Sequence, residues 1–339
     1  MYKRQKISTI LASGDKNIDL ISVNDEMISE FKHKGYLEPL EKNVMTEEVR
    51  DSFPQKYLES ICEENGHIYS VPFQMDIMMF WVNQELLKQA GLDEIKNTGD
   101  FDILQKSLKN PDQYAYGDAW ENTHVYNSLS QFVNFWGGDY FDWTDPKTKD
   151  AARYMKSMLD EKNTSPAQFV DQYEQMEEKF IRGKYGCVFM YTSALGTFLD
   201  ADVYGKNKIH MAPLPVLHKK KATNIATWQY VLNNASENKD AAVRFLQYAA
   251  GYEGSTEYAK IMKSYPARVD VIENEDIDLE GIDMIRKYLR EYTLNARPLC
   301  ENSMGAVSDM GKLFQGYVLG QCEEDSFFEQ AQNCINTYY

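Results

Sequence analysis

The sequence lacks several features that would assign the chain to a function class at once. No apolar run approaches the roughly 20 residues that a membrane-spanning helix requires. The five cysteines form no Cys-x-x-Cys pair, and none of the five histidines lies at a metal-ligand spacing from them. This odd, scattered set predicts free thiols. The start, MYKRQKISTILASGD, is basic but has no apolar h-region, so no signal peptide is predicted within this chain.

Positive charge is also scarce. Acids outnumber bases 52 to 36, and the formal net charge of −16 argues against a nucleic-acid partner, because phosphate backbones are bound by clustered Lys and Arg. The basic run HKKK at 218–221 is short and is interpreted as a solvated turn. No Ser/His/Asp set, Gly-rich phosphate loop or metal cluster is evident. The sequence therefore predicts no metal and no cofactor.

What is present is typical of a globular protein with two domains. The chain has 339 residues, of which 43% are hydrophobic and 26% charged, with only 10 Pro and 19 Gly. Strand-like and helix-like segments alternate, which favours an α/β fold. The clearest buried strand is YGCVFMY at 185–191, and helices are expected at about 46–62 and 146–162.

Two segments combine strand ends with polar side chains. The first is a strand at 18–23 that runs into Asn24 and Asp25, and ligands collect at such carboxyl ends of strands in open α/β sheets. Capping of the following helix is the alternative role for this pair. The second is the stretch 66–92, in which Asp76 interrupts the apolar run QMDIMMFW. A charge there is costly unless it is paired, so Asp76 is either a strand-end residue or a ligand acceptor.

Seven segments, taken together and in order, carry a resemblance to a known family: LASGDKNIDLISVNDEMISEFKHKGYLEPLE, GHIYSVPFQMDIMMFWVNQELLKQAGL, EKFIRGKYGCVFMYTS, MAPLPV, ATWQYVLNNASENKDAAVRFLQYA, YPARVDV and NARPLCENSMGAVSDMGKLFQGYVLG. They resemble the extracellular solute-binding proteins of ABC importers, specifically the carbohydrate-binding family that includes maltodextrin-binding proteins. The family's Pro-x-Thr-Trp segment has no counterpart in GLDEIKNTGDFDILQKSL.

The resemblance implies a two-lobed, type II periplasmic-binding-protein-like fold, in which each lobe is a mixed sheet flanked by helices. The expected N-lobe comprises 1–113 with 229–296, and the expected C-lobe comprises 114–228 with 297–339. The chain resembles the family from its third strand onward, which suggests a truncated form without signal peptide and first strands. An exposed sheet edge and an uncovered apolar face are then expected, with the flank MMFW (78–81) as the most vulnerable place.

The implied ligand is a carbohydrate, which is bound through aromatic platforms and hydrogen-bonding side chains. The candidate contacts are Asn24, Asp25, Gln74, Asp76, Trp120, Tyr191, Trp228, Tyr230, Arg268 and Arg297. Trp228 is the preferred stacking platform and Trp120 the second, although a Trp in an extended run is more often part of a core. Arg268 has an equally simple alternative, which is to tie its turn to a neighbouring acid.

The resemblance further implies how the protein would act. Two lobes close on an oligosaccharide in an interlobe cleft, and the closed, monomeric form docks on the transmembrane permease subunits of an ABC importer. The location would be extracytoplasmic, either periplasmic or as a cell-surface lipoprotein. A polyamine, peptide or organic anion on the same fold is the alternative ligand. A carbohydrate-active enzyme is the rival class, but few carboxylates stand out in the predicted cleft.

Overall fold

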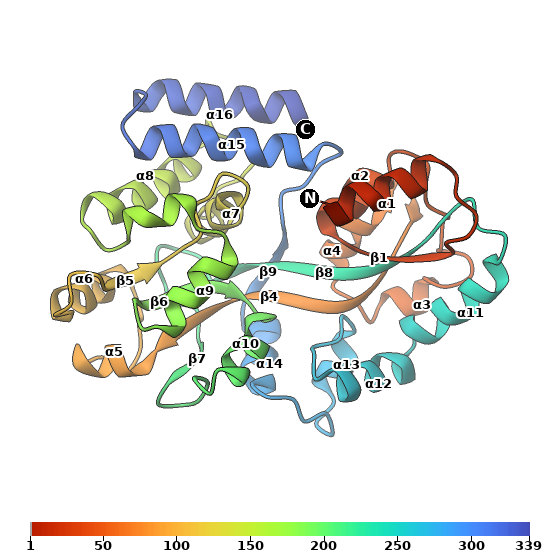
Figure 1. The fold of residues 1–339 in the computed structure, drawn as a ribbon, viewed down its shortest axis with the longest axis horizontal. Helices are drawn as coiled ribbons and strands as arrows, with labels where there is room; N and C mark the ends of the chain where they lie inside the picture. Colours follow the sequence, from red (N-terminus) through yellow and green to blue (C-terminus); the bar gives the residue numbers. More distant parts are fainter. Residues whose placement is uncertain (1) are drawn as a thin grey trace. The chain divides into compact units, whose positions relative to one another are not determined.

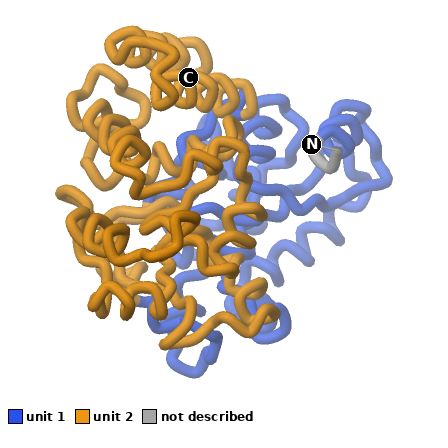
Figure 2. The backbone as a smooth tube through the Cα atoms, turned by 60° about the vertical axis from the view of Figure 1, so that its left-hand side comes forward, with its two compact units in different colours: residues 1–76, 225–286, 295–303 blue, residues 77–224, 287–294, 304–339 orange. Residues whose placement is uncertain are grey.

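The computed structural model describes residues 2–339, and the chain divides into two compact units (Figures 1 and 2). Unit 1 is built from the segments up to Asp76, Ile225–Arg286 and Asn295–Ser303. Unit 2 is built from Ile77–Asn224, Lys287–Leu294 and Met304–Tyr339. The chain thus passes between the units more than once. Strands β4 (Val71–Asn83), β8 (Ala222–Leu232) and β9 (Thr293–Ala296) and helix α14 (Ile282–Glu291) each contribute residues to both units.

These units divide the chain differently from the predicted lobes. Residues 77–113 and 287–294 were predicted in the N-lobe but belong to unit 2, and residues 225–228 and 297–303 were predicted in the C-lobe but belong to unit 1. The residues that follow Asp76 belong to unit 2 because β4 does not end at Asp76. It continues as one strand to Asn83, and its second half pairs with two strands of unit 2.

Unit 1 holds an antiparallel strand pair with helices around it. Strand β1 pairs with β8 in the register Leu20↔Leu232 to Asn24↔Trp228, and among the described strands it pairs with no other. The predicted helix at 46–62 is interrupted, because Pro54 cannot continue a preceding helix. The elements of unit 1 are α1 Tyr2–Ala12, β1 Leu20–Asn24, α2 Asp25–Phe31, α3 Glu47–Arg50, α4 Gln55–Tyr57, the π-helix η1 Leu58–Cys62, β2 Glu63–Glu64, β3 His67–Ile68, α11 Lys239–Ala250, α12 Tyr252–Met262 and α13 Val269–Glu273.

Unit 2 contains a mixed sheet. Strand β6 pairs antiparallel with β4 and parallel with β5, and β7 pairs antiparallel with β4. The elements of unit 2 are α5 Gln84–Gln89, α6 Thr98–Ser107, β5 Tyr114–Gly117, α7 Val125–Trp136, α8 Pro146–Asp160, the 3-10 helix η2 Pro166–Val170, α9 Tyr173–Ile181, β6 Tyr185–Tyr191, α10 Ala194–Asp200, β7 Ile209–Ala212, α15 Ser303–Val318 and α16 Glu324–Tyr338.

Strand β6 forms at the residues that the sequence predicts, 185–191, and all seven of its residues are buried. A strand covered on both faces shows a continuous apolar run instead of alternation. The flank at 78–81 behaves in the same way, with exposed fractions of 0–1%. Its predicted exposure is therefore wrong, because this half of β4 lies between β6 and β7 inside unit 2.

Helices of unit 2 begin and end where the sequence signals them. Asp145 caps α8 by accepting a hydrogen bond from the Lys147 N–H, and Pro146 occupies the first turn. Gly137 ends α7 in the left-handed conformation, with φ of 70°. Helices α15 and α16 run side by side (Figure 1), joined by the stacked rings of Tyr317 and Phe327, whose centroids lie 4.5 Å apart.

Candidate ligand-binding site

The junction between β1 and α2 shows how local sequence positions the first two candidates. Asn24 caps α2, since its Oδ1 accepts a hydrogen bond from the Met27 N–H at 3.2 Å. The capping role predicted as an alternative is therefore confirmed. Its position on β1 lies opposite Trp228 in the register with β8. Trp228 is half-buried in unit 1.

Asp25 is fully buried in unit 1 and is the centre of a polar network. Its Oδ1 accepts hydrogen bonds from the Tyr57 hydroxyl at 2.6 Å and from the Thr227 N–H at 2.9 Å. The Tyr57 hydroxyl in turn accepts from Gln229 Nε2 at 2.8 Å. The network joins residues from α2, α4 and β8, so Asp25 holds the framework of unit 1 together.

Arg297 completes this network from the 295–303 segment. Its Nε donates to Asp25 Oδ2 at 3.2 Å, and its Nη1 donates to Glu26 Oε1 at 2.7 Å. Burial raises the pKa of Asp25 above its usual value, and the Arg297 guanidinium opposes this rise, while Glu26 adds to it. The arginine thus keeps two neighbouring carboxylates compensated in a poorly solvated place.

Arg268, at the start of α13, is likewise held by hydrogen bonds to other residues of unit 1. It donates to both carboxylate oxygens of Asp270, at 3.0 and 2.6 Å, and to the Ala250 carbonyl and the Ser52 hydroxyl at 2.8 Å each. This geometry matches the structural alternative, in which the arginine ties its turn to an acid. A ligand contact by Arg268 or Arg297 stays a prediction, and either would compete with these partners.

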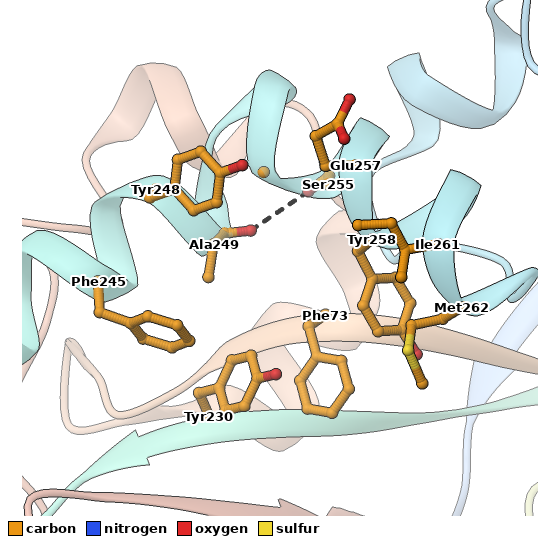
Figure 3. Close-up of a pocket in the computed structure, with 11 residues that line it drawn as sticks. Phe73, Tyr230, Phe245, Tyr248, Ala249, Ser255, Glu257, Tyr258, Ile261 and Met262 are labelled. Atoms are coloured by element: carbon orange, nitrogen blue, oxygen red, sulfur yellow. Dashed lines mark hydrogen bonds between the residues drawn. The ribbon is translucent and has the colours of Figure 1, made fainter.

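Gln74 and Tyr230 lie close to a group of aromatic side chains in unit 1. Tyr230 stacks on Phe73 with ring centroids 4.1 Å apart (Figure 3). Gln74 Oε1 accepts a hydrogen bond from the Tyr258 hydroxyl at 2.9 Å. Asp76, the last residue of the first segment of unit 1, is 8% exposed. The ligand roles of these three residues stay predictions.

Trp120 lies in the core of unit 2. Its side chain is 0% exposed, and its ring makes edge contacts with Phe169 and Phe314 at centroid distances of 5.6 and 5.4 Å. A stacking platform needs one open ring face, so this burial argues against the role predicted for Trp120. The prediction weighed the core alternative for tryptophans in general, and Trp120 fits that alternative.

Tyr191 lies at the carboxyl end of β6, where it lines a pocket of about 200 Å³ that belongs entirely to unit 2. Its hydroxyl donates to Asn127 Oδ1 at 3.0 Å, and its ring makes an edge contact with Tyr173 at 5.9 Å. We name this cavity the Tyr191 pocket. Its lining residues are Tyr173, Glu174, Glu177, Met190, Tyr191, Ser193 and Ala194.

Two carboxylates and a second tyrosine of the Tyr191 pocket were missed by the sequence reasoning. Tyr173, Glu174 and Glu177 share the first turns of α9, and no motif distinguishes that helix from an ordinary amphipathic one. Glu177 Oε1 is buried without a hydrogen-bond partner among the described residues. Burial raises the pKa of Glu177, the Thr197 hydroxyl lowers it by hydrogen bonding, and Glu174 adds to the rise. A ligand hydroxyl is the kind of donor that would satisfy this oxygen.

Metal and membrane features are absent from the described part of the chain. Within residues 2–339, no group of three or more His, Cys, Asp or Glu side chains is placed to hold a metal ion. No helix in the same range combines the length and the apolar character needed to cross a bilayer. None of the five cysteines is joined to another by a disulfide.

Comparison with known sequences decides the family. The sequence model of the bacterial extracellular solute-binding proteins matches residues 2–256, about three quarters of the chain. The chain belongs to this family. The resemblance inferred from seven ordered segments is thereby confirmed, and a family of solute-binding proteins is one whose members bind and do not catalyse.

Two curated relatives of this solute-binding protein differ in their ligands. A probable amino-acid ABC transporter periplasmic-binding protein of Sinorhizobium fredii is 24% identical over 67% of the chain, and the arabinooligosaccharide-binding protein of Bacillus subtilis is 22% identical over 80% of it. The matches cover 54% and 65% of the relatives' own lengths. The chain thus spans less than two thirds of either relative.

A solved structure confirms the predicted fold class. An ABC transporter solute-binding protein from Thermotoga lettingae, bound to alpha-D-tagatose, superposes with a TM-score of 0.83 at 18% identity. The match covers 98% of this chain and 88% of the other. At such low identity the likeness shows the fold and leaves the ligand open.

Proposed function

We propose that this solute-binding protein binds a neutral carbohydrate and delivers it to the permease subunits of an ABC importer outside the cytoplasm. The observation that carries the proposal is the chemistry of the Tyr191 pocket. Two tyrosines give flat rings for the C–H faces of a sugar, while Glu177 offers a buried carboxylate oxygen to a hydroxyl group. Catalysis is not part of the proposal, since the family is one of solute-binding proteins.

The relatives support the same ligand class. The Bacillus subtilis protein is named for an arabinooligosaccharide, and the Thermotoga lettingae structure holds a ketose. The Sinorhizobium fredii protein, named as a probable amino-acid binder, represents the competing class. We therefore keep a charged solute as the second candidate.

The arginines favour the neutral sugar over an anion. A carboxylate-bearing ligand is normally held by Arg through paired hydrogen bonds. Here Arg268 already holds Asp270, and Arg297 already holds Asp25 and Glu26, each with its side chain at most 9% exposed. Using Arg297 for a ligand would leave the buried Asp25 without its cation, which costs several kcal/mol, and using Arg268 would break its paired hydrogen bonds to Asp270.

The family supports delivery to a permease, and the way the chain is threaded supports a movement of the two units about shared strands. Strands that contribute to both units are the natural hinge, because small rotations about them move whole units. We propose that the ligand shifts an equilibrium between open and closed forms and that the closed form is the one that docks. The predicted platform Trp228, which is half-buried, also belongs to this proposal.

A thermal-shift screen over neutral oligosaccharides, alditols, amino acids, polyamines and organic anions tests the ligand class. A ligand present at about 100 times its Kd stabilises the folded state by about 2.7 kcal/mol, which gives a measurable rise in Tm. We expect neutral sugars to raise Tm and the charged solutes to leave it unchanged. A shift from charged solutes alone, or turnover of any glycoside, contradicts the proposal.

Two pairs of variants locate the site. Glu177→Gln should weaken sugar binding about tenfold, because the amide is a poorer acceptor, whereas the neighbouring Glu178→Gln should bind normally, since Glu178 is 59% exposed and pairs with Arg182. Trp228→Ala should abolish the shift, and Phe141→Ala, an exposed ring of unit 2, should not. Equal binding by Glu177→Gln and Glu178→Gln would remove the Tyr191 pocket from the site.

A further inference from the structure

A second cavity, distinct from the Tyr191 pocket, lies wholly within unit 1 (Figure 3). Its volume is about 270 Å³, near the lower end of the roughly 300–1,000 Å³ that ligand pockets span. We name it the aromatic pocket. Its lining residues are Phe73, Tyr230, Phe245, Tyr248, Ala249, Gly254, Ser255, Glu257, Tyr258, Ile261 and Met262.

Four elements form the aromatic pocket, and each supplies at least one ring. Phe73 from β4 and Tyr230 from β8 stack at 4.1 Å to make its base. Phe245 from α11 meets Tyr230 edge-on at 5.4 Å, and Tyr258 from α12 meets Phe73 edge-on at 5.5 Å. The rings surround an open space, with the methyl group of Ala249 directed into it (Figure 3).

The rim of this pocket is unusually apolar for a surface. Phe245 and Tyr248 on α11 are 45% and 50% exposed, while Ile261 and Met262 at the end of α12 are 73% and 58% exposed. Exposed apolar side chains that cluster around a cavity lose unfavourable hydration when a ligand covers them. The cavity thus has a driving force for binding that scattered surface residues lack.

The polar groups at the pocket narrow the ligand chemistry. The Tyr258 hydroxyl is committed to Gln74, and the Ser255 hydroxyl to the Ala249 carbonyl at 3.3 Å. Among the described residues that line the cavity, none is Lys or Arg, and the Glu257 carboxylate points away from the rings (Figure 3). A sugar would find few hydrogen-bond partners in this pocket. An anion would find no Lys or Arg among its lining residues, and the net charge of −16 on the chain would repel it.

From this geometry we propose that the aromatic pocket is a separate binding site for a small, uncharged aromatic compound with one ring or two fused rings. The volume admits a single small ring system, and the ring faces and edges of the lining offer stacked and edge-on contacts to it. The hydroxyls of Tyr230 and Tyr248 are the groups that would orient a polar substituent. Burial raises the pKa of Tyr230, so its hydroxyl keeps its proton at neutral pH. The site does not depend on carbohydrate binding.

The test is a fluorescence titration with the neutral naphthalene probe 6-propionyl-2-(dimethylamino)naphthalene, whose emission shifts to shorter wavelength in apolar surroundings. We expect saturable binding of one probe per chain. Ala249→Phe, which fills the space, and Phe245→Ala, which removes an exposed ring, should each weaken binding at least about tenfold. Ile18→Ala is the matched control, since Ile18 is a 37% exposed residue of unit 1 outside the pocket. A naphthalenesulfonate of similar size should bind more weakly than the neutral probe.

Several outcomes would overturn the proposal. One is that both pocket variants bind the probe as tightly as the parent protein. Another is that Ile18→Ala loses as much probe affinity as the pocket variants, and a third is that the sulfonate binds as tightly as the neutral probe. Light scattering measures the molar mass and so tests whether a second copy of the chain binds to this face. A dimer that Phe245→Ala converts to a monomer would make the face a subunit interface and refute the small-molecule site. Each variant's Tm, measured without probe, shows that a loss of binding is not a loss of folding.

Discussion

Replacement of Arg297 by Met tests whether this arginine is held by the fold or is free to serve a ligand. The change removes the cation that lies 3.2 Å from Asp25 Oδ2 and 2.7 Å from Glu26 Oε1. Asp25 is 0% exposed and Glu26 only 16% exposed, so neither charge can be solvated well in its place. Breaking a buried ion pair from one side costs about 3–5 kcal/mol. We expect a loss of that size in the free energy of unfolding.

Arg153→Met is the matched control. Arg153 donates to Glu324 at 2.6 Å, an equally short contact, but the two side chains are 42% and 41% exposed. Solvent screens such a pair, and its loss should cost about 0–1 kcal/mol. Urea unfolding followed by circular dichroism measures both variants against the parent protein. The comparison isolates burial, because the bond type is the same in the two pairs.

The pH dependence sharpens the test. Burial raises the pKa of Asp25 in the folded protein, and Arg297 holds that rise in check. A carboxyl group with a raised folded-state pKa stabilises the fold below its unfolded-state pKa, and this contribution is lost as pH rises through the folded-state pKa. Without Arg297 the pKa of Asp25 rises further. The penalty of Arg297→Met should therefore be greatest at neutral pH, shrink as the pH falls through the raised folded-state pKa of Asp25, and be lost by about pH 4, the ordinary range of a carboxyl group in the unfolded chain.

Two results would refute this reasoning. One is a penalty for Arg297→Met that is no larger than that for Arg153→Met. The other is a penalty that stays constant between pH 7 and pH 4, because the cost would then not come from an uncompensated carboxylate. Either result would return Arg297 to the set of residues free to contact a ligand.

The remaining predictions concern packing and thiol chemistry. Gly117→Ala should destabilise the protein by about 1–3 kcal/mol in urea unfolding, because the added Cβ would collide with the Tyr185 ring. At Gly196 on α10 an added Cβ meets nothing within 4 Å, so Gly196→Ala should stabilise the protein by up to about 1 kcal/mol. The reverse order of stabilities would contradict the packing described for β5 and β6. Alkylation at pH 8, read by mass spectrometry, should modify Cys300 and Cys322 before Cys62 and Cys187, which are fully buried. Burial raises the pKa of Cys62 to about 12 and that of Cys187 well above its usual value, so early alkylation of either would be unexpected.

The placement of charges has a consequence for ligand choice. Arg268 and Arg297 were both predicted as ligand donors, and each is tied to a carboxylate within unit 1. The candidate contacts that remain after this are aromatic rings, amides and acids, which suit a neutral polyol better than an anion. The stability test on Arg297 and the ligand screen therefore both test whether the ligand is neutral or anionic.

The sequence by itself determined the local elements and the family. Seven consecutive apolar or small residues predicted β6, Asp145-Pro146 predicted the start of α8, and Gly137 the end of α7, because these signals act between neighbours in the chain. The order of seven short segments predicted the family and its fold. Asn24 was also predicted correctly as a possible helix cap, since capping depends on residues only three positions apart.

Only the tertiary structure decided which side chains meet. Asp25 and Arg297 are 272 positions apart, and Trp120 is enclosed by rings from η2 and α15, so no local pattern could reveal a buried ion pair or a buried tryptophan. The course of β4 through both units also depended on its partners, since β6 and β7 cover the half that carries 78–81. The aromatic pocket forms where β4 meets β8, α11 and α12, which come much later in the chain. Periodicity records which face of an element is apolar, and packing alone determines what lies against that face.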